Sequence, residues 1–251
     1  MKFSHLDNKL KIRIIPAKPS IGLVIGTHGS PAYIHLFLES AKRNFPVPIL
    51  VHDDFSQVEL KSLIEQYGCD FSINNRRYGH GSGDITTYYN GLNWAKNKGI
   101  DILVKMSRRF IPFFDWRPSL IQTALKSQHI TYTNYCEYFK FGFRPECVGM
   151  YVPEWVKYVE NLKNLAETPI NVEKDLMELI NGFPRTCIVN ESYASSGDKY
   201  CQYYGIWDII GNNRMMEQKD ILWHDNSGPA AYLNKAIIYG INKYNLKDFI
   251  I

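Results

Sequence analysis

The sequence has few cysteines, no long apolar run and no export signal. Its five cysteines are scattered and include no C-x-x-C pair, which excludes a disulfide framework and the common cysteine-rich zinc sites. No apolar run approaches the roughly 20 residues that a membrane-spanning helix needs. The polar first residues, MKFSHLDNKLKIR, do not resemble a secretory signal. These absences predict a cytoplasmic protein with reduced thiols and no transmembrane segment, and they leave open a peripheral membrane contact.

Neither sign of charge is in large excess, because the sequence has 29 basic and 25 acidic residues and no long block of either. The formal net charge of +4 suits an anionic small-molecule substrate and is too weak to indicate a nucleic-acid partner. Hydrophobic residues make up 45% of the 251 positions, which is enough for one large core. The 17 tyrosines suit flat polar ligands such as sugars and bases, although many rings belong in a core.

Short apolar runs alternate with helical segments through the first half of the chain. This alternation predicts an α/β fold, with a mostly parallel sheet flanked by helices. A glycine-rich loop is expected over 78–84, before the third helix. The expected strands are 21–26, 48–51, 71–73 and 102–104, and the expected helices are 31–41, 58–67 and 85–98.

The second half is less regular. It contains no repeat, low-complexity tract or clear linker, so we expect a single domain over 1–251 with two functional halves, about 20–116 and 117–251. The expected strands are 130–133, the end of 143–152 and 187–189, and the expected helices are 154–165, 172–180 and 230–239.

Polar residues follow three of the predicted strands. They are Thr27-His28, Asp53-Asp54 and Ser107-Arg108-Arg109. Since the carboxyl ends of parallel strands meet at one edge of a sheet, these residues are expected to line a common crevice. Asp53 or Asp54 could accept hydrogen bonds from a nucleotide base, with Thr27 and His28 lining the same pocket. The alternative for the aspartates is a helix cap beside a solvated neighbour.

The order of these motifs resembles the nucleotide-sugar-binding half of GT-A-fold glycosyltransferases, nearest to the family-2 type. That family has a strand ending in a T-Y-N-like turn, a second ending in D-D-G-S and a third ending in a D-x-D metal motif. Residues 25–31, 51–56 and 104–109 stand at the corresponding places, and the resemblance covers about 20–116. It implies a GT-A-like sheet that binds a nucleotide-diphosphate sugar as donor, with an acceptor-binding second half.

The third motif departs from the family pattern. Ser107 and Arg109 stand where the two aspartates would hold Mn²⁺ or Mg²⁺, and a hydroxyl with a guanidinium does not form that site. We therefore expect no metal ligands here. An arginine pair can instead neutralise a diphosphate directly, so Arg108 or Arg109, aided by Lys105 or Arg77, is expected to stabilise the leaving group. A degenerate, inactive site is the alternative.

An inverting transfer needs a general base for the acceptor hydroxyl. The resemblance places this carboxylate at the start of a helix in the second half, where Glu173 and Asp175 are the closest match. Acidic residues are also favoured in a first helical turn by the helix dipole alone, so a structural role stays open. His224 could contact the diphosphate or the acceptor, or it could be a packed loop histidine.

The function expected from the resemblance is transfer of a sugar from a nucleotide-diphosphate sugar to a hydroxyl of a glycan or lipid-linked acceptor, in polysaccharide biosynthesis. We expect the enzyme to be inverting and independent of metal. The alternative is a non-catalytic nucleotide-sugar or glycan-binding protein on a degenerate GT-A scaffold. The sequence leaves open the sugar, the nucleotide base, the acceptor and the oligomeric state.

Overall fold

The computed structural model describes residues 14–44, 46–108, 117–134, 145, 147–168, 171–183 and 186–190. The elements follow the chain in the order β1 (Ile21–Thr27), α1 (Pro31–Asn44), β2 (Ile49–Asp53), α2 (Lys61–Gln66), β3 (Asp70–Ile73), α3 (His80–Lys98) and β4 (Ile102–Ser107). They continue with α4 (Arg117–Ser127), β5 (Thr131–Asn134), β6 (Cys147–Tyr151), α5 (Val152–Trp155), the 3₁₀ turn η1 (Val156–Tyr158), α6 (Val159–Ala166), α7 (Val172–Asn181) and β7 (Thr186–Asn190).

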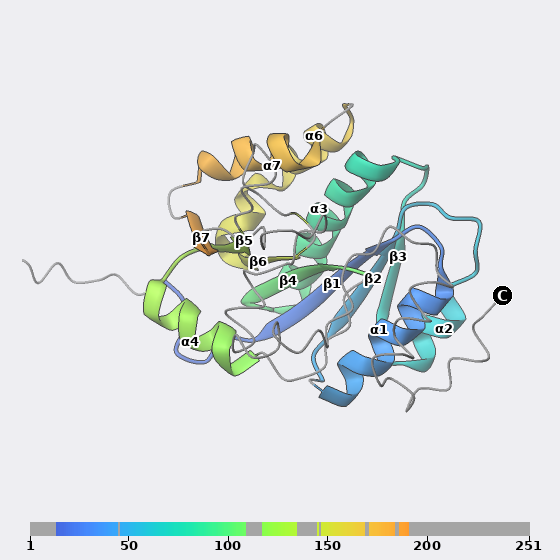
Figure 1. The fold of residues 1–251 in the computed structure, drawn as a ribbon, viewed down its shortest axis with the longest axis horizontal. Helices are drawn as coiled ribbons and strands as arrows, with labels where there is room; N and C mark the ends of the chain where they lie inside the picture. Colours follow the sequence, from blue (N-terminus) through green and yellow to red (C-terminus); the bar gives the residue numbers. More distant parts are fainter. Residues whose placement is uncertain are drawn as a thin grey trace, which may run out of the picture.

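The described strands form one seven-stranded sheet in the order β3-β2-β1-β4-β6-β5-β7. Strand β6 runs antiparallel to β4 and β5, and the other pairings are parallel. Figure 1 shows α1, α2 and α4 below the sheet and α3, α6 and α7 above it. Both faces are therefore covered, which explains why β1, β2 and β4 read as continuous apolar runs. The predicted fold class, a mostly parallel sheet flanked by helices, is confirmed.

The order of the strands reverses direction at β1. From β1 the chain moves outward to β2 and β3, and α3 then carries it back to β4 on the other side of β1. The carboxyl ends of β1 and β4 lie side by side, with Gly26 paired to Ser107. Ligands of open α/β sheets bind at such a reversal, outside the carboxyl ends of the strands.

Helix α3 lies close to the sheet because glycines stand at the contact. A Cβ atom at Gly91 would come within 2.7 Å of Val24 Cγ1, and one at Gly26 would come within 2.5 Å of Thr87 Oγ1. Any larger side chain would push α3 away from β1. This close approach fixes α3 directly over the strands that form the reversal.

The glycine-rich stretch is helical from His80, so the loop expected over 78–84 is confined to Tyr78 and Gly79. Helix α3 begins at His80, after Gly79 at a φ of 90°, and the Gly83 N–H already donates to the Gly79 carbonyl at 2.7 Å. Glycine alone adopts this φ without strain. The low helix propensity of three glycines suggested a loop, but the contact of this turn with β2 overrides that preference.

Other boundaries also differ from the sequence prediction. Helix α2 begins at Lys61 and not at 58, and the expected helix over 154–165 is divided into α5, η1 and α6. Helix α4 was not predicted. The expected helix over 230–239 lies outside the described residues. Within the described ranges, no helix combines the length and the apolar character that a membrane span requires.

His52 of β2 is buried between the sheet and α3. Its Nδ1 lies 2.8 Å from Ser72 Oγ, and its Nε2 lies 3.1 Å from Thr86 Oγ1 and 3.3 Å from Asn90 Nδ2. The amide donor of Asn90 leads us to place the imidazole proton on Nδ1. Burial lowers the pKa of His52 from 6.5 to about 4, and nearby carboxylates offset this only in part. The ring is therefore a neutral structural group at physiological pH.

His52 should make the protein less stable as the pH falls from 6.5 to 4. The unfolded chain binds a proton at this histidine below pH 6.5, whereas the folded chain resists it until about pH 4. The loss amounts to about 3 kcal/mol of unfolding free energy across this window. Urea unfolding at several pH values gives the unfolding free energy of the wild type and of His52→Gln, and the wild type should lose more of it between pH 6.5 and 4. An equal dependence of the unfolding free energy on pH in the two proteins would contradict this assignment.

Candidate functional site

The turn after β1 has an unusual backbone. Gly29 and Ser30 adopt φ values of 68° and 63°, and Thr27 Oγ1 donates to the Gly29 carbonyl at 2.5 Å. Thr27 is only 4% exposed, while His28 is half-buried. The turn therefore presents the side chain of His28 at the carboxyl end of β1 and keeps Thr27 largely covered.

Asp53 joins this turn to the turn after β2. Its Oδ1 accepts the Gly29 N–H at 3.0 Å, and its Oδ2 accepts both the N–H and the Oγ–H of Ser56 at 2.8 Å. The residue is 0% exposed. Both carboxylate oxygens serve protein donors, so this geometry favours a structural role for Asp53 over direct contact with a nucleotide. That role is to join two turns and is not the helix cap considered as the alternative.

Asp54 holds the loop that precedes α3. Its Oδ1 accepts from Asn74 Nδ2 and from the Tyr78 N–H, and its Oδ2 accepts the Gly79 N–H, each at 2.9 Å. A Cβ at Gly83 would lie 2.5 Å from Asp54 Oδ2, so the carboxylate rests against the first turn of α3. With 6% of Asp54 exposed, its main visible role is to shape this edge.

Sequence reasoning missed Asn74 and Tyr78 as the partners of Asp54. The glycines of the stretch Tyr78 to Asp84 accommodate this carboxylate, which belongs to the same chain. His28 joins the same cluster, because its Nδ1 lies 2.9 Å from the Asp54 carbonyl oxygen. The ends of β1 and β2 and the loop after β3 are thus tied into one rigid edge.

Ser107 ends β4 beside this edge, and Arg108 follows it in a turn. Ser107 lies across from Gly26 of β1, and both residues are half-buried. The Arg108 guanidinium carbon lies 5.6 Å from the centre of the Tyr33 ring, so Arg108 reaches toward α1. Arg109 lies outside the described residues.

Lys105 is buried and paired within the protein, a geometry that favours a structural role over the predicted assistance to the leaving group. The residue is 0% exposed, and its Nζ donates to the two carboxylate oxygens of Asp84 at 2.5 and 2.7 Å and to the Pro145 carbonyl at 2.8 Å. The ammonium also lies 5.1 Å from the centre of the Tyr88 ring. This lysine joins β4 to the start of α3 inside the protein.

Arg77 stands in the loop that Asp54 holds, and its side chain is exposed. The neighbouring Arg76 pairs with Glu167 near the end of α6, and the Tyr78 hydroxyl donates to Glu167 Oε1 at 2.9 Å. These contacts connect the loop after β3 with the second half of the chain. Arg77 thus belongs to a loop that is anchored to both halves, while Arg76 is engaged in an ion pair.

The two candidate bases lie in the first turn of α7. Asp175 Oδ2 accepts the Asn171 N–H at 2.9 Å, and Asn171 Oδ1 accepts the Lys174 N–H at 2.9 Å. This reciprocal cap gives Asp175 a structural role through hydrogen bonds, in addition to the helix-dipole effect expected for an acidic residue in a first turn. Glu173 is the second residue of α7, and its side chain lies outside what the structure describes. His224 also lies outside the described residues.

The end of β4 does not fit a divalent cation. Such an ion prefers several carboxylate or carbonyl oxygens, whereas Ser107 offers a hydroxyl and Arg108 a cation. Across the described ranges, no group of three His, Cys, Asp or Glu residues is arranged to hold a metal. The chemistry proposed below therefore uses no step through a metal.

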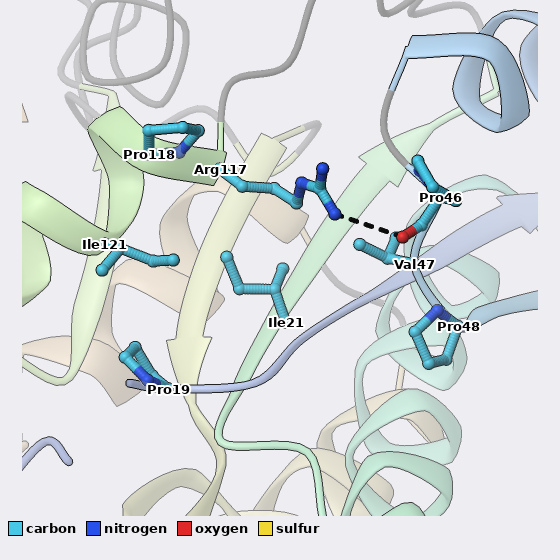
Figure 2. A pocket seen from close by; sticks show the side chains of 8 residues that line it. All are labelled: Pro19, Ile21, Pro46, Val47, Pro48, Arg117, Pro118 and Ile121. Carbon is cyan, nitrogen blue, oxygen red and sulfur yellow. Dashed lines mark hydrogen bonds between the residues drawn. The ribbon is translucent and has the colours of Figure 1, made fainter. Parts of the chain in front are cut away.

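A cavity of about 410 Å³ lies at the opposite, amino end of the parallel strands (Figure 2). Arg117 Nη1 donates to the Pro46 carbonyl at 3.2 Å beside it. The cavity is lined mainly by prolines and aliphatic residues. The lining residues are Pro19, Ile21, Pro46, Val47, Pro48, Arg117, Pro118 and Ile121. This cavity contains none of the predicted site residues.

No protein-family model and no curated protein matches the chain. Among solved structures, it is similar to the glycosyltransferase GlyE of Streptococcus pneumoniae, with 14% identity, a TM-score of 0.48, and coverage of 65% of this chain and 43% of that one. It is also similar to glucosyl-3-phosphoglycerate synthase of Mycobacterium tuberculosis, solved with Mn²⁺, UDP and glucosyl-3-phosphoglycerate. There the identity is 13%, the TM-score is 0.41, and coverage is 55% of this chain and 58% of that one. The chain thus spans less than two thirds of these structures, and its function has to be argued from its own residues.

The Asp84–Lys105 pair gives an asymmetric stability prediction. Asp84→Asn should lower the free energy of unfolding by about 3–5 kcal/mol, because it leaves an ammonium at 1% side-chain exposure without its counter-ion. Lys105→Met should cost less, since the Asp84 carboxylate is 25% exposed and can be hydrated. Urea unfolding at pH 7 measures both changes.

Lys61→Met is the matched control, because its pair with Glu65 is exposed and should change stability little. The prediction is wrong if Lys105→Met lowers the free energy of unfolding more than Asp84→Asn does. The Lys105 ammonium would then not be the group that needs its counter-ion.

Proposed function

We propose that this protein is a glycosyltransferase that moves a sugar from a nucleotide-diphosphate sugar to a hydroxyl of a glycan or lipid-linked acceptor. The observation that carries the proposal is the reversal of strand order at β1. It brings His28, Ser107 and Arg108 to one edge of the sheet, where open α/β sheets bind ligands. The motif order that resembles GT-A glycosyltransferases falls on these same strand ends.

The nucleoside is assigned to the ends of β1 and β2. Asp53 and Asp54 hold the surrounding turns rigid, so the backbone groups and His28 are in place before a ligand arrives. Such preorganisation lowers the entropy lost on binding. We assign Thr27 to the wall of this pocket and Asp54 to its shape.

The diphosphate is assigned to the end of β4. Arg108 and Arg109 supply planar guanidinium groups that match phosphate oxygens, and the exposed Arg77 approaches from the loop after β3. These cations take the place of a metal ion in stabilising the departing nucleoside diphosphate. The transfer is therefore proposed to be independent of Mn²⁺ and Mg²⁺.

In the proposed inverting reaction, a carboxylate removes the proton of the acceptor hydroxyl. The oxygen forms a bond to the anomeric carbon as the bond from that carbon to the phosphate oxygen breaks. The two electrons of the broken bond leave with the nucleoside diphosphate, whose charge the arginines stabilise. Arg108 and Arg109 act on the leaving group, and the base acts on the acceptor.

Helix α7 begins on the correct side of the sheet to supply this base. The Thr168 carbonyl accepts from Ser82 Oγ in the first turn of α3 at 3.1 Å, and the cap residue Asn171 follows three residues later. That first turn lies at the carboxyl end of the strands. Because Asp175 serves the cap of α7, Glu173 is the stronger candidate.

A non-catalytic nucleotide-sugar-binding protein is the second candidate. The observation that favours it is the serine and arginine at the end of β4, in place of the carboxylates of the resembling motif. Donor turnover distinguishes the two candidates, because a binding protein holds the donor without cleaving it.

Removing the arginines should slow turnover. We expect Arg108→Ala and Arg109→Ala to lower kcat by about 10²–10³-fold, the scale of a lost transition-state donor. Arg117→Ala is the matched control, since this arginine lies beside the cavity at the other end of the strands. Release of nucleoside diphosphate from UDP-, GDP-, CDP- and dTDP-sugars measures the rate, with and without EDTA.

Turnover that persists in EDTA supports direct stabilisation by arginine. Turnover that is lost in EDTA and restored by Mn²⁺ would contradict metal independence. Tight donor binding without turnover, over a broad acceptor panel, would contradict the enzyme and establish the binding protein.

Replacing the base should affect turnover and leave donor binding intact. Glu173→Gln is expected to lower kcat by about 10²–10⁴-fold with an unchanged donor dissociation constant. Asp175→Asn should mainly weaken the cap of α7 and lower the Tm. Glu178→Gln, on an exposed residue of the same helix, is the control. Full activity of Glu173→Gln would assign the base to another residue.

A further inference from the structure

Phe55, in the turn after β2, has a backbone conformation that bulky residues avoid. Its φ is 53°, and among the described residues only Ser30 and Gln128 share a positive φ without being glycine. The Cβ atom of an L-residue is crowded against the backbone in this region, so glycine would adopt it with less strain. A strained residue at a candidate site is a reason to look for function there.

Packing does not explain why Phe55 occupies this place. The side chain is 38% exposed, whereas its neighbours Asp54 and Ser56 are 6% and 9% exposed. The hydrogen bonds of Ser56 to Asp53 and of Asp54 to the next loop hold the turn on both sides of Phe55. The turn therefore fixes the strained backbone and directs the ring toward solvent.

Phe55 belongs to a group of exposed apolar residues at this edge. Over the described ranges, the large hydrophobic side chains that are exposed are Phe55, Val58 and Ile73, at 38%, 44% and 49%. Ile73 ends β3 in register with Asp53, and Val58 lies beside the turn after β1. Large apolar side chains left exposed near the carboxyl ends of the strands are available to contact a ligand.

The geometry points to Phe55 as the platform on which the nucleobase of the donor stacks, an inference that rests on the proposed function. Phe55 directly follows Asp54, whose carbonyl oxygen lies 2.9 Å from His28 Nδ1. Strand β1 lies between β2 and β4, and Arg108 directly follows β4. Two strand spacings amount to about 10 Å, which suits a ribose between a base and a diphosphate. Any nucleobase can stack on an aromatic ring, so Phe55 contributes binding affinity, and polar groups determine which base is preferred.

Titration of the full chain with UDP, GDP, CDP and dTDP tests this inference. For the nucleotide that the wild type binds, Phe55→Gly and Phe55→Asn should weaken binding about tenfold or more, and Phe55→Tyr should preserve it within about twofold. Phe55→Gly should also raise the Tm by about 2–4 °C, because glycine relieves the strained φ. Binding of inorganic pyrophosphate should be the same in all variants, and Val58→Ala is the control for the apolar edge.

The outcomes separate this inference from the function on which it rests. A wild type that binds none of the four nucleotides would overturn both. Nucleotide binding by Phe55→Gly and Phe55→Asn that equals the wild type would overturn the platform alone. A joint fall of Tm and affinity in Phe55→Gly would assign Phe55 to packing and likewise overturn the platform.

Discussion

Three hydrogen bonds to the buried carboxylate of Asp53 connect the two turns on which the candidate site depends. The Gly29 N–H comes from the turn after β1, and the N–H and Oγ–H of Ser56 come from the turn after β2. A buried carboxylate is tolerated because donors satisfy both of its oxygens. The same bonds maintain the left-handed backbone of Gly29 and Phe55 at the carboxyl edge of the sheet. Stability and the shape of this edge therefore have a common origin in one side chain.

Strand β4 places its cations in two different environments. Lys105 faces α3 and is paired with Asp84, whereas Arg108 lies past the last strand residue and reaches Tyr33 on α1. The charge of Lys105 is neutralised inside the protein, so it contributes to folding and not to a ligand. The charge of Arg108 is at the edge where a diphosphate would be held. Two cations three residues apart thus have unrelated roles, because one lies within the sheet and the other beyond its end.

The parts of the fold that depend on local pattern were predictable, and the parts that depend on distant partners were not. The apolar runs of β1, β2 and β4 predicted a mostly parallel sheet, and the polar residues after them were expected to lie at its carboxyl edge, where His28, Asp54 and Ser107 are found. The helical start at His80 depends on Asp54, 25 residues before Gly79, which accepts the N–H of that glycine. The burial of Lys105 depends on Asp84, which adjoins it only after α3 has folded onto the sheet. Arg109 and His224, both predicted site residues, lie outside the described residues.

A crystal structure of the protein with a bound nucleoside diphosphate tests the central claim most directly. The account predicts the base and ribose at the ends of β1 and β2, beside His28 and Phe55, with the diphosphate at the end of β4 near Arg108. A nucleotide bound instead in the proline-lined cavity beside Arg117, at the amino end of the strands, would contradict it.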